Sequence, residues 1–142
     1  MSIWFRPITI AEITARSQGT LSEFLGIEFT EITDDSISAI MPVTANIKQP
    51  AGIVHGGANV VLAETIASTA ANYVVDLEKY YCVGLEINAN HIKAVTEGII
   101  SATTKPIHLG KKTQVWEIGL RNSEQEITCI SRMTAYVIKR KA

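Results

Sequence analysis

Several features that would assign this 142-residue sequence to a familiar protein class are scarce or absent. Its three histidines and two cysteines show none of the spacings typical of metal sites. No apolar run reaches the roughly eighteen residues that a membrane-spanning helix needs. The formal net charge is only −1, so no general electrostatic attraction to nucleic acid or membranes is expected. We therefore expect neither a metal nor another cofactor, and neither a membrane nor a nucleic-acid partner.

The cysteines and the amino-terminal segment bear on the cellular compartment. Cys82 and Cys129 lie in strand-like patterns, where a reduced, buried thiol usually acts as a small hydrophobic side chain. Residues 1–6 lack the charged start and the long apolar run of a signal peptide. A cytoplasmic protein is expected.

The length predicts a single domain over residues 1–142, and the 46% of apolar residues is enough for its core. We expect short amino-terminal helices within residues 8–25 and a core over residues 26–138. Thr20 and Glu23 have the spacing of a capping box at the start of the second short helix.

Alternation of apolar and polar residues predicts six strands, and one long apolar helix is expected at 57–75. The strands are expected at 27–32, 37–42, 82–94, 99–107, 112–120 and 126–138. The fourth should end near Pro106, because proline cannot sit in a central ladder. Two sets of residues should each share one strand face: Ile27, Phe29 and Glu31, and then Val83, Leu85, Ile87, Ala89 and His91. Short turns make neighbours antiparallel, so we predict an α+β fold with the sheet curled around the helix.

The most informative stretch is residues 49–71, which contains the triplet His55-Gly56-Gly57 and then the apolar helix. Glu64 is the one acid in that helix. A buried carboxylate is costly unless it is paired, hydrogen-bonded or used in chemistry, so Glu64 is the first candidate for a catalytic group. Its plainer interpretation is a glutamate that faces solvent.

Backbone donors at the start of this helix form a second candidate feature. The first N–H groups of a helix have no intrahelical partner, and Gly56 and Gly57 leave them open to a ligand. Such donors can stabilise a developing oxyanion. A plain turn at the glycines and a capping role for His55 are the alternatives.

Three segments together resemble the hotdog-fold acyl-CoA thioesterases: QPxGxVHGGAxxxLAExxAS, VGLEINANH and KPIHLGKKTQVWEI. The resemblance covers about residues 20–138. It is greatest to the branch that acts on aromatic acyl-CoAs, such as hydroxybenzoyl-CoA, phenylacetyl-CoA and 1,4-dihydroxy-2-naphthoyl-CoA. The resemblance thus implies a hotdog fold and thioester hydrolysis, with a link to menaquinone biosynthesis if the last of these is the substrate.

The resemblance also implies roles for individual residues. The catalytic group would be Glu64, Gln49, His55, Ser68 and the N–H of Gly56, with Glu64 acting as nucleophile or as general base. The acyl group would contact Thr69, Asn72 and His91. Apart from the resemblance, CoA carries phosphates, so a basic rim should meet them, and its candidates are Lys93, Lys105, His108, Lys111 and Lys112. Residues 108–111 match the family's HLG turn, which adds Leu109 and Gly110 to the predicted binding residues. The plainer interpretation of these rim residues is ordinary solvated strand ends.

Two other functions stay open at this point, a hotdog hydratase or dehydratase and a non-catalytic acyl-CoA-binding module. The hydratases use an Asp and His pair that has no counterpart here.

The distance between two candidate residues along the helix predicts an active site shared between subunits. Gly56 and Glu64 are roughly 12 Å apart along one helix at 1.5 Å per residue, too far to act on one carbonyl. A second helix antiparallel to the first, across a two-fold axis, would bring them together. We therefore expect a homodimer or a homotetramer with sites at the dimer interface, where Ala63, Ala67 and Ala70 allow the helices to pack closely.

Overall fold

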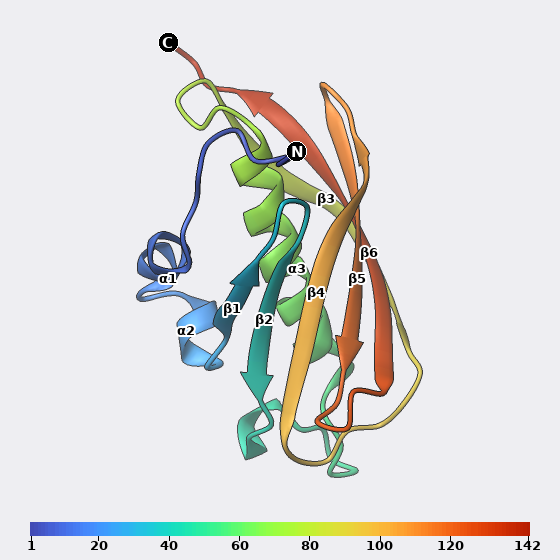
Figure 1. Ribbon diagram of the computed structural model, residues 1–142. Coiled ribbons are helices and arrows are strands. Elements are labelled where there is room, and N and C mark those ends of the chain that lie inside the picture. Colours follow the sequence, from blue (N-terminus) through green and yellow to red (C-terminus); the bar gives the residue numbers. More distant parts are fainter.

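The computed structural model describes residues 1–142 and contains three α-helices, one 3-10 turn and six strands (Figure 1). The helices are α1 (Ile10–Ser17), α2 (Leu21–Phe24) and α3 (Gly56–Val74), and the 3-10 turn η1 is Ala45–Ile47. The strands are β1 (Glu28–Ile32), β2 (Ile37–Pro42), β3 (Tyr80–His91), β4 (Ile99–Leu109), β5 (Thr113–Arg121) and β6 (Ile127–Lys139). No helix combines the length and the hydropathy needed to cross a membrane.

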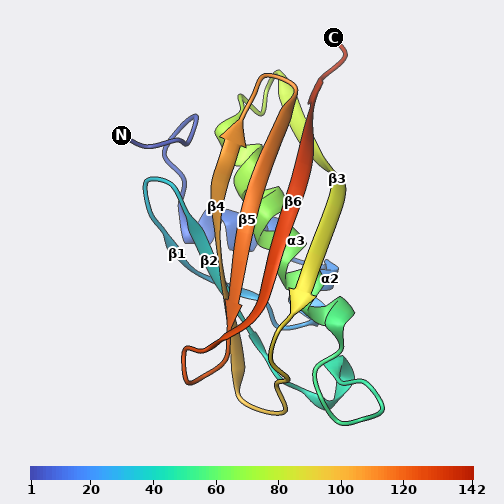
Figure 2. The same cartoon turned by 90° about the vertical axis from the view of Figure 1, so that its right-hand side faces the viewer.

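One antiparallel sheet, in the order β1-β2-β4-β5-β6-β3, curls around α3 (Figures 1 and 2). The predicted α+β architecture, the hotdog fold, is confirmed. The long helix lies against the concave face of the sheet, and α1 and α2 lie on the opposite side of α3 (Figure 1). The free edges of the sheet belong to β1 and β3.

The core forms where α3 meets the sheet. The helix buries Leu62 and Ile66, and the sheet contributes Trp116 and Ile118. The small residues Ala63, Ala67 and Ala70 are also fully buried within the chain. The expectation that these alanines contact a neighbouring subunit is therefore wrong. The partly exposed positions of α3 include Val60, Val61, Glu64, Thr65 and Ser68.

Two β-bulges change which residues share a strand face. In β1 the register shifts between Phe29 and Glu31, so Phe29 is buried while Glu31 is exposed. In β3 the register shifts between Gly84 and Glu86, which leaves Leu85 as the extra residue. Both predicted faces are wrong for this reason, because a bulge moves the following residues to the other side of the strand.

The fourth strand continues through Pro106, contrary to the prediction that it ends there. Pro106 pairs with Trp116 of β5, whereas the pairing of β4 with β2 stops at Thr104. The missing proline N–H therefore lies beyond the last β2 partner and leaves no gap in that ladder.

The second short helix begins after Thr20, as expected, but without the predicted capping box. The hydroxyl of Thr20 donates to the carbonyl of Ser17 at 2.5 Å, and Thr20 makes no side-chain cap. Glu23 accepts instead from the N–H of Gly19 at 2.5 Å.

Candidate active site

The loop before α3 holds the first group of predicted site residues. The side-chain oxygen of Gln49 accepts the N–H of Ala51, and the Gln49 carbonyl accepts the N–H of Gly52 at 2.9 Å. His55 is the N-cap of α3, and its Nδ1 accepts the N–H of Gly57 at 2.8 Å. In a neutral imidazole this places the proton on Nε2. The capping role proposed for His55 is real, and it leaves an exposed ring N–H as a donor.

Gly56 supplies the donor at the helix start. Its N–H has no acceptor within the chain, whereas the N–H groups of Gly57 and Ala58 are both accepted by His55. A Cβ at Gly56 would lie 2.7 Å from Nε2 of His91, so only glycine lets the end of β3 approach this closely. The unpaired N–H at the positive end of the helix dipole is suited to a negatively charged oxygen.

His91 and Gly56 line one cavity of about 320 Å³ together with Gln49, Asn59 and Lys93. Asn59 is buried, its Nδ2 lies 3.3 Å from Nδ1 of His91, and its Oδ1 has no partner. The structure thus brings Gln49, Gly56, His91 and Lys93 together at one end of α3. Lys93 also forms an ion pair with Glu126.

Glu64 lies two turns further along α3, half-buried and in no ion pair. A Cβ at Gly84 would lie 2.7 Å from its Oε1 and 3.9 Å from Sδ of Met133. The carboxylate therefore rests where a strand residue has no side chain, beside the β3 bulge. Glu64 is therefore neither fully buried nor fully exposed to solvent, and its role as a reactive group stays a prediction.

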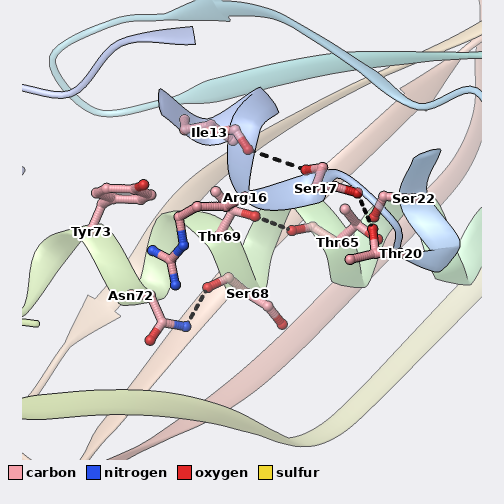
Figure 3. Close-up of a pocket in the computed structure, with 10 residues that line it drawn as sticks. All are labelled: Ile13, Arg16, Ser17, Thr20, Ser22, Thr65, Ser68, Thr69, Asn72 and Tyr73. Atoms are coloured by element: carbon pink, nitrogen blue, oxygen red, sulfur yellow. Dashed lines mark hydrogen bonds between the residues drawn. The ribbon is translucent and has the colours of Figure 1, made fainter. Parts of the chain in front are cut away.

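Ser68 follows Glu64 by one turn and lies on the same side of the helix. Its hydroxyl donates to Sδ of Met133 at 3.5 Å, a weak acceptor that leaves the hydroxyl available to a stronger one. Ser68, Thr69 and Asn72 line a pocket of about 260 Å³ between α3 and the short helices (Figure 3). Glu64 lies outside this pocket but one turn from Ser68, and these four residues are grouped here as the second cluster.

Asn72 in this cluster is occupied by main-chain groups. Its Nδ2 donates to the carbonyls of Ser68 at 2.9 Å and Cys82 at 3.2 Å. Its Oδ1 accepts the N–H of Cys82 at 2.9 Å. This amide ties α3 to β3 beside the pocket.

The turn at 108–112 follows β4 and lies at the other end of the molecule from the start of α3 (Figure 1). His108 packs on Gly110, whose N–H donates to the carbonyl of Thr113 at 2.9 Å. Lys111 and Lys112 are exposed and form no ion pair. Lys105 is engaged elsewhere, 3.6 Å from Asp35. Within one subunit, the predicted site residues therefore lie in three separate groups.

Sequence reasoning missed Gly84, Met133, Asn59 and Arg16, all of which contact these clusters. Gly84 carried a usable signal, since a glycine inside a strand pattern often marks a bulge or a close approach. The other three became visible only through tertiary packing.

Comparison with known proteins gives the family. A family model described as "Thioesterase superfamily" matches residues 51–129 of the chain. The chain belongs to the thioesterase superfamily. This thioesterase is 43% identical over 136 residues to the 1,4-dihydroxy-2-naphthoyl-CoA hydrolase of Escherichia coli, covering 96% of this chain and 99% of the relative. It is 41% identical over 136 residues to the proofreading thioesterase EntH of Cronobacter turicensis, and the alignment covers 96% of this chain and 98% of EntH.

A solved structure agrees with these relatives. The crystal structure of a mutant thioesterase from Pseudomonas aeruginosa superposes on this thioesterase with a TM-score of 0.96. The two sequences are 40% identical, and the superposition covers 98% of this chain and 100% of the Pseudomonas aeruginosa chain. The thioesterase is therefore an enzyme that hydrolyses thioesters, and the resemblance stated from the sequence is confirmed.

Proposed function

We propose that this thioesterase hydrolyses an aromatic acyl-CoA, with 1,4-dihydroxy-2-naphthoyl-CoA as the first candidate. The E. coli hydrolase named for that substrate shares 43% of the aligned residues, which supports the choice. The observation that carries the proposal is the unpaired carboxylate of Glu64 held against Gly84, with an unpaired N–H at Gly56 for the oxyanion.

The proposed chemistry needs these groups and water. Glu64 either attacks the thioester carbon itself or removes a proton from an attacking water. The carbonyl oxygen becomes negatively charged and accepts the N–H of Gly56. The carbon–sulfur bond then breaks, the thiolate of CoA leaves and takes a proton, and the free acid remains. In the covalent route, water hydrolyses the acyl–Glu64 anhydride in a second step.

Gln49 and His55 are proposed to orient the thioester or the water, and Ser68 the water beside Glu64. Their positions support these roles in different ways. His55 presents Nε2–H beside the Gly56 donor, and Ser68 lies one turn from the acid. The turn 108–112 is proposed to bind the CoA phosphates through Lys111 and Lys112, both exposed and free of carboxylate partners.

We also propose that each active site combines two subunits, in a homodimer that can pair into a tetramer. The separation of Gly56 and Glu64 into two clusters supports this, because one carbonyl must lie about 3 Å from both groups. The edge strand β3 passes both clusters and exposes Val83 and Leu85, at 39% and 61%. A two-fold axis near this edge would place Gly56 of one subunit against Glu64 of the other.

The first experiment measures thiol release from benzoyl-CoA, 1,4-dihydroxy-2-naphthoyl-CoA and a straight-chain acyl-CoA of equal carbon number to the benzoyl group. We expect the aromatic substrates to have the higher kcat/KM. Faster turnover of the straight-chain substrate would refute the aromatic assignment. Tight binding of all three without thiol release would instead indicate a non-catalytic acyl-CoA-binding protein.

The second experiment mixes two inactive variants, Glu64→Ala and Gln49→Ala, by joint unfolding and refolding. If sites are shared, each mixed dimer contains one site with both wild-type residues, so activity returns. Tagging the variants differently and purifying the mixed dimer provides the control. Activity in that purified dimer no higher than in either parent would exclude the shared site.

A further inference from the structure

Arg16 is an arginine without an ionic partner at the mouth of the pocket that Ser68 lines. It lies in the last turn of α1 and extends across the pocket toward α3 (Figure 3). Its guanidinium lies 5.5 Å from the ring centroid of Tyr73 and forms no ion pair within the chain. The guanidinium lines a mostly polar pocket, and its five N–H donors make no hydrogen bond within the chain.

A second arginine on the same ring provides the contrast. Arg6 lies 5.9 Å from the Tyr73 centroid, but it is paired with Glu12 at 2.5 Å and lies outside the pocket. That pairing lowers the pKa of Glu12, chiefly through the hydrogen bond from Arg6. Packing on Tyr73 thus accounts for both arginines, but only Arg16 both lines the pocket and lacks a carboxylate partner.

The hydroxyls around Arg16 define the complementary ligand. Ser17, Thr20 and Thr69 donate their protons to main-chain carbonyls, at 3.2, 2.5 and 2.7 Å. Toward the pocket they therefore present oxygen lone pairs, which accept hydrogen bonds. A ligand hydroxyl can donate to such an oxygen while it accepts from Arg16. A carboxylate only accepts, so it could not form hydrogen bonds with these three oxygens, whereas a ligand hydroxyl can use them and Arg16 together.

The pocket begins beside Glu64, the proposed reacting group. Thr65 and Ser68 line it, and they are the residue after Glu64 and the residue one turn further on. An acyl group whose carbonyl lies at Glu64 can therefore extend along α3 toward Arg16. Ile13 and Tyr73 provide the apolar part of the lining, which suits a ring.

From these contacts we infer that Arg16 determines acyl specificity by binding a hydroxyl on the acyl ring, on the side remote from the thioester. The inference rests on the proposed function and deepens it. Arg16 selects among aryl-CoAs and takes no part in breaking the thioester.

The test compares 4-hydroxybenzoyl-CoA, benzoyl-CoA and 4-carboxybenzoyl-CoA on the full-length enzyme. Wild type should favour the hydroxylated substrate over benzoyl-CoA in kcat/KM. Arg16→Gln should reduce that preference about tenfold or more, the size of one hydrogen bond to a charged group. Arg6→Gln is the matched control, because it removes the other cation from Tyr73, and it should leave the preference unchanged.

Each result separates the inference from the proposed function. An equal loss with Arg6→Gln, or no loss with Arg16→Gln, would overturn the role of Arg16 while aryl-CoA hydrolysis stands. If the wild-type enzyme prefers 4-carboxybenzoyl-CoA, the inference that Arg16 binds a hydroxyl is wrong. Absence of hydrolysis of every aryl-CoA would overturn the proposed function itself. If Arg16→Gln fails to fold, Arg16→Lys takes its place, since it keeps the charge but loses the planar fork.

Discussion

Gly84→Ala is the substitution that tests most directly how the acid is held. The added Cβ would lie 2.7 Å from Oε1 of Glu64, whereas ordinary contact begins at 3.4 Å. The carboxylate must therefore move by about 0.7 Å. A misplacement of about 1 Å can cost about a hundredfold in rate, so we expect kcat to fall by about ten- to a hundredfold.

The fold should tolerate this change. Gly84 is not among the glycines with positive φ, so alanine fits its backbone conformation. At such positions alanine stabilises by about 0.4–1 kcal/mol through the unfolded chain. Gly119→Ala on β5 is the matched control, because its Cβ would meet only Cδ1 of Ile127 at 3.8 Å. Both variants should unfold at temperatures close to wild type, and only Gly84→Ala should lose turnover.

A double-mutant cycle makes the assay specific to the contact. Glu64→Asp shortens the acid by one methylene, so it withdraws the carboxylate from the new methyl group. The Glu64→Asp substitution should therefore reduce the rate of the chemical step less in the Gly84→Ala background than in wild type. Single-turnover kinetics with saturating enzyme measures the chemical step in all four proteins. A folded Gly84→Ala enzyme with wild-type turnover would refute the idea that Glu64 reacts from its place against Gly84.

Three further predictions concern other parts of the molecule. Glu64→Ala should lower kcat by at least about a hundredfold, as expected for a positioned acid–base group, and leave the circular dichroism spectrum unchanged. A folded variant with near-normal rates would move the catalytic role elsewhere. Lys111→Ala and Lys112→Ala should raise KM, by less as salt increases, and spare kcat, whereas Lys79→Ala, whose ammonium is paired with Asp76 at 3.1 Å, should not. An equal effect on a substrate without the nucleotide portion would exclude phosphate binding. Burial raises the pKa of Cys82 to about 11 and also raises the pKa of Cys129, so at pH 8 only about a thousandth of Cys82 is thiolate. Iodoacetamide should label both cysteines slowly until denaturant is added, and rapid native labelling at pH 8 would contradict this burial.

The elements of the fold could be read from the sequence because their signals are local. Alternation located all six strands to within a few residues, and the apolar run located α3 to within one residue at each end. Strand faces were predicted less well. The bulges at Thr30 and Leu85 arise from pairing with β2 and β6, so apolar alternation within β1 or β3 does not locate them, and only Gly84 hints at the second.

The sequence by itself singled out the candidate catalytic groups: a carboxylate in an apolar helix, and open N–H groups at the start of that helix. The cost of burying Glu64 and the freedom of Gly56 are properties of the residues, which is why they could be recognised early. Only the tertiary structure decided how these groups are held. Strand pairing places Gly84 under Glu64, and helix packing brings Arg16 of α1 to the pocket beside Ser68. These contacts join residues far apart in the chain, and their geometry depends on packing that local patterns do not encode.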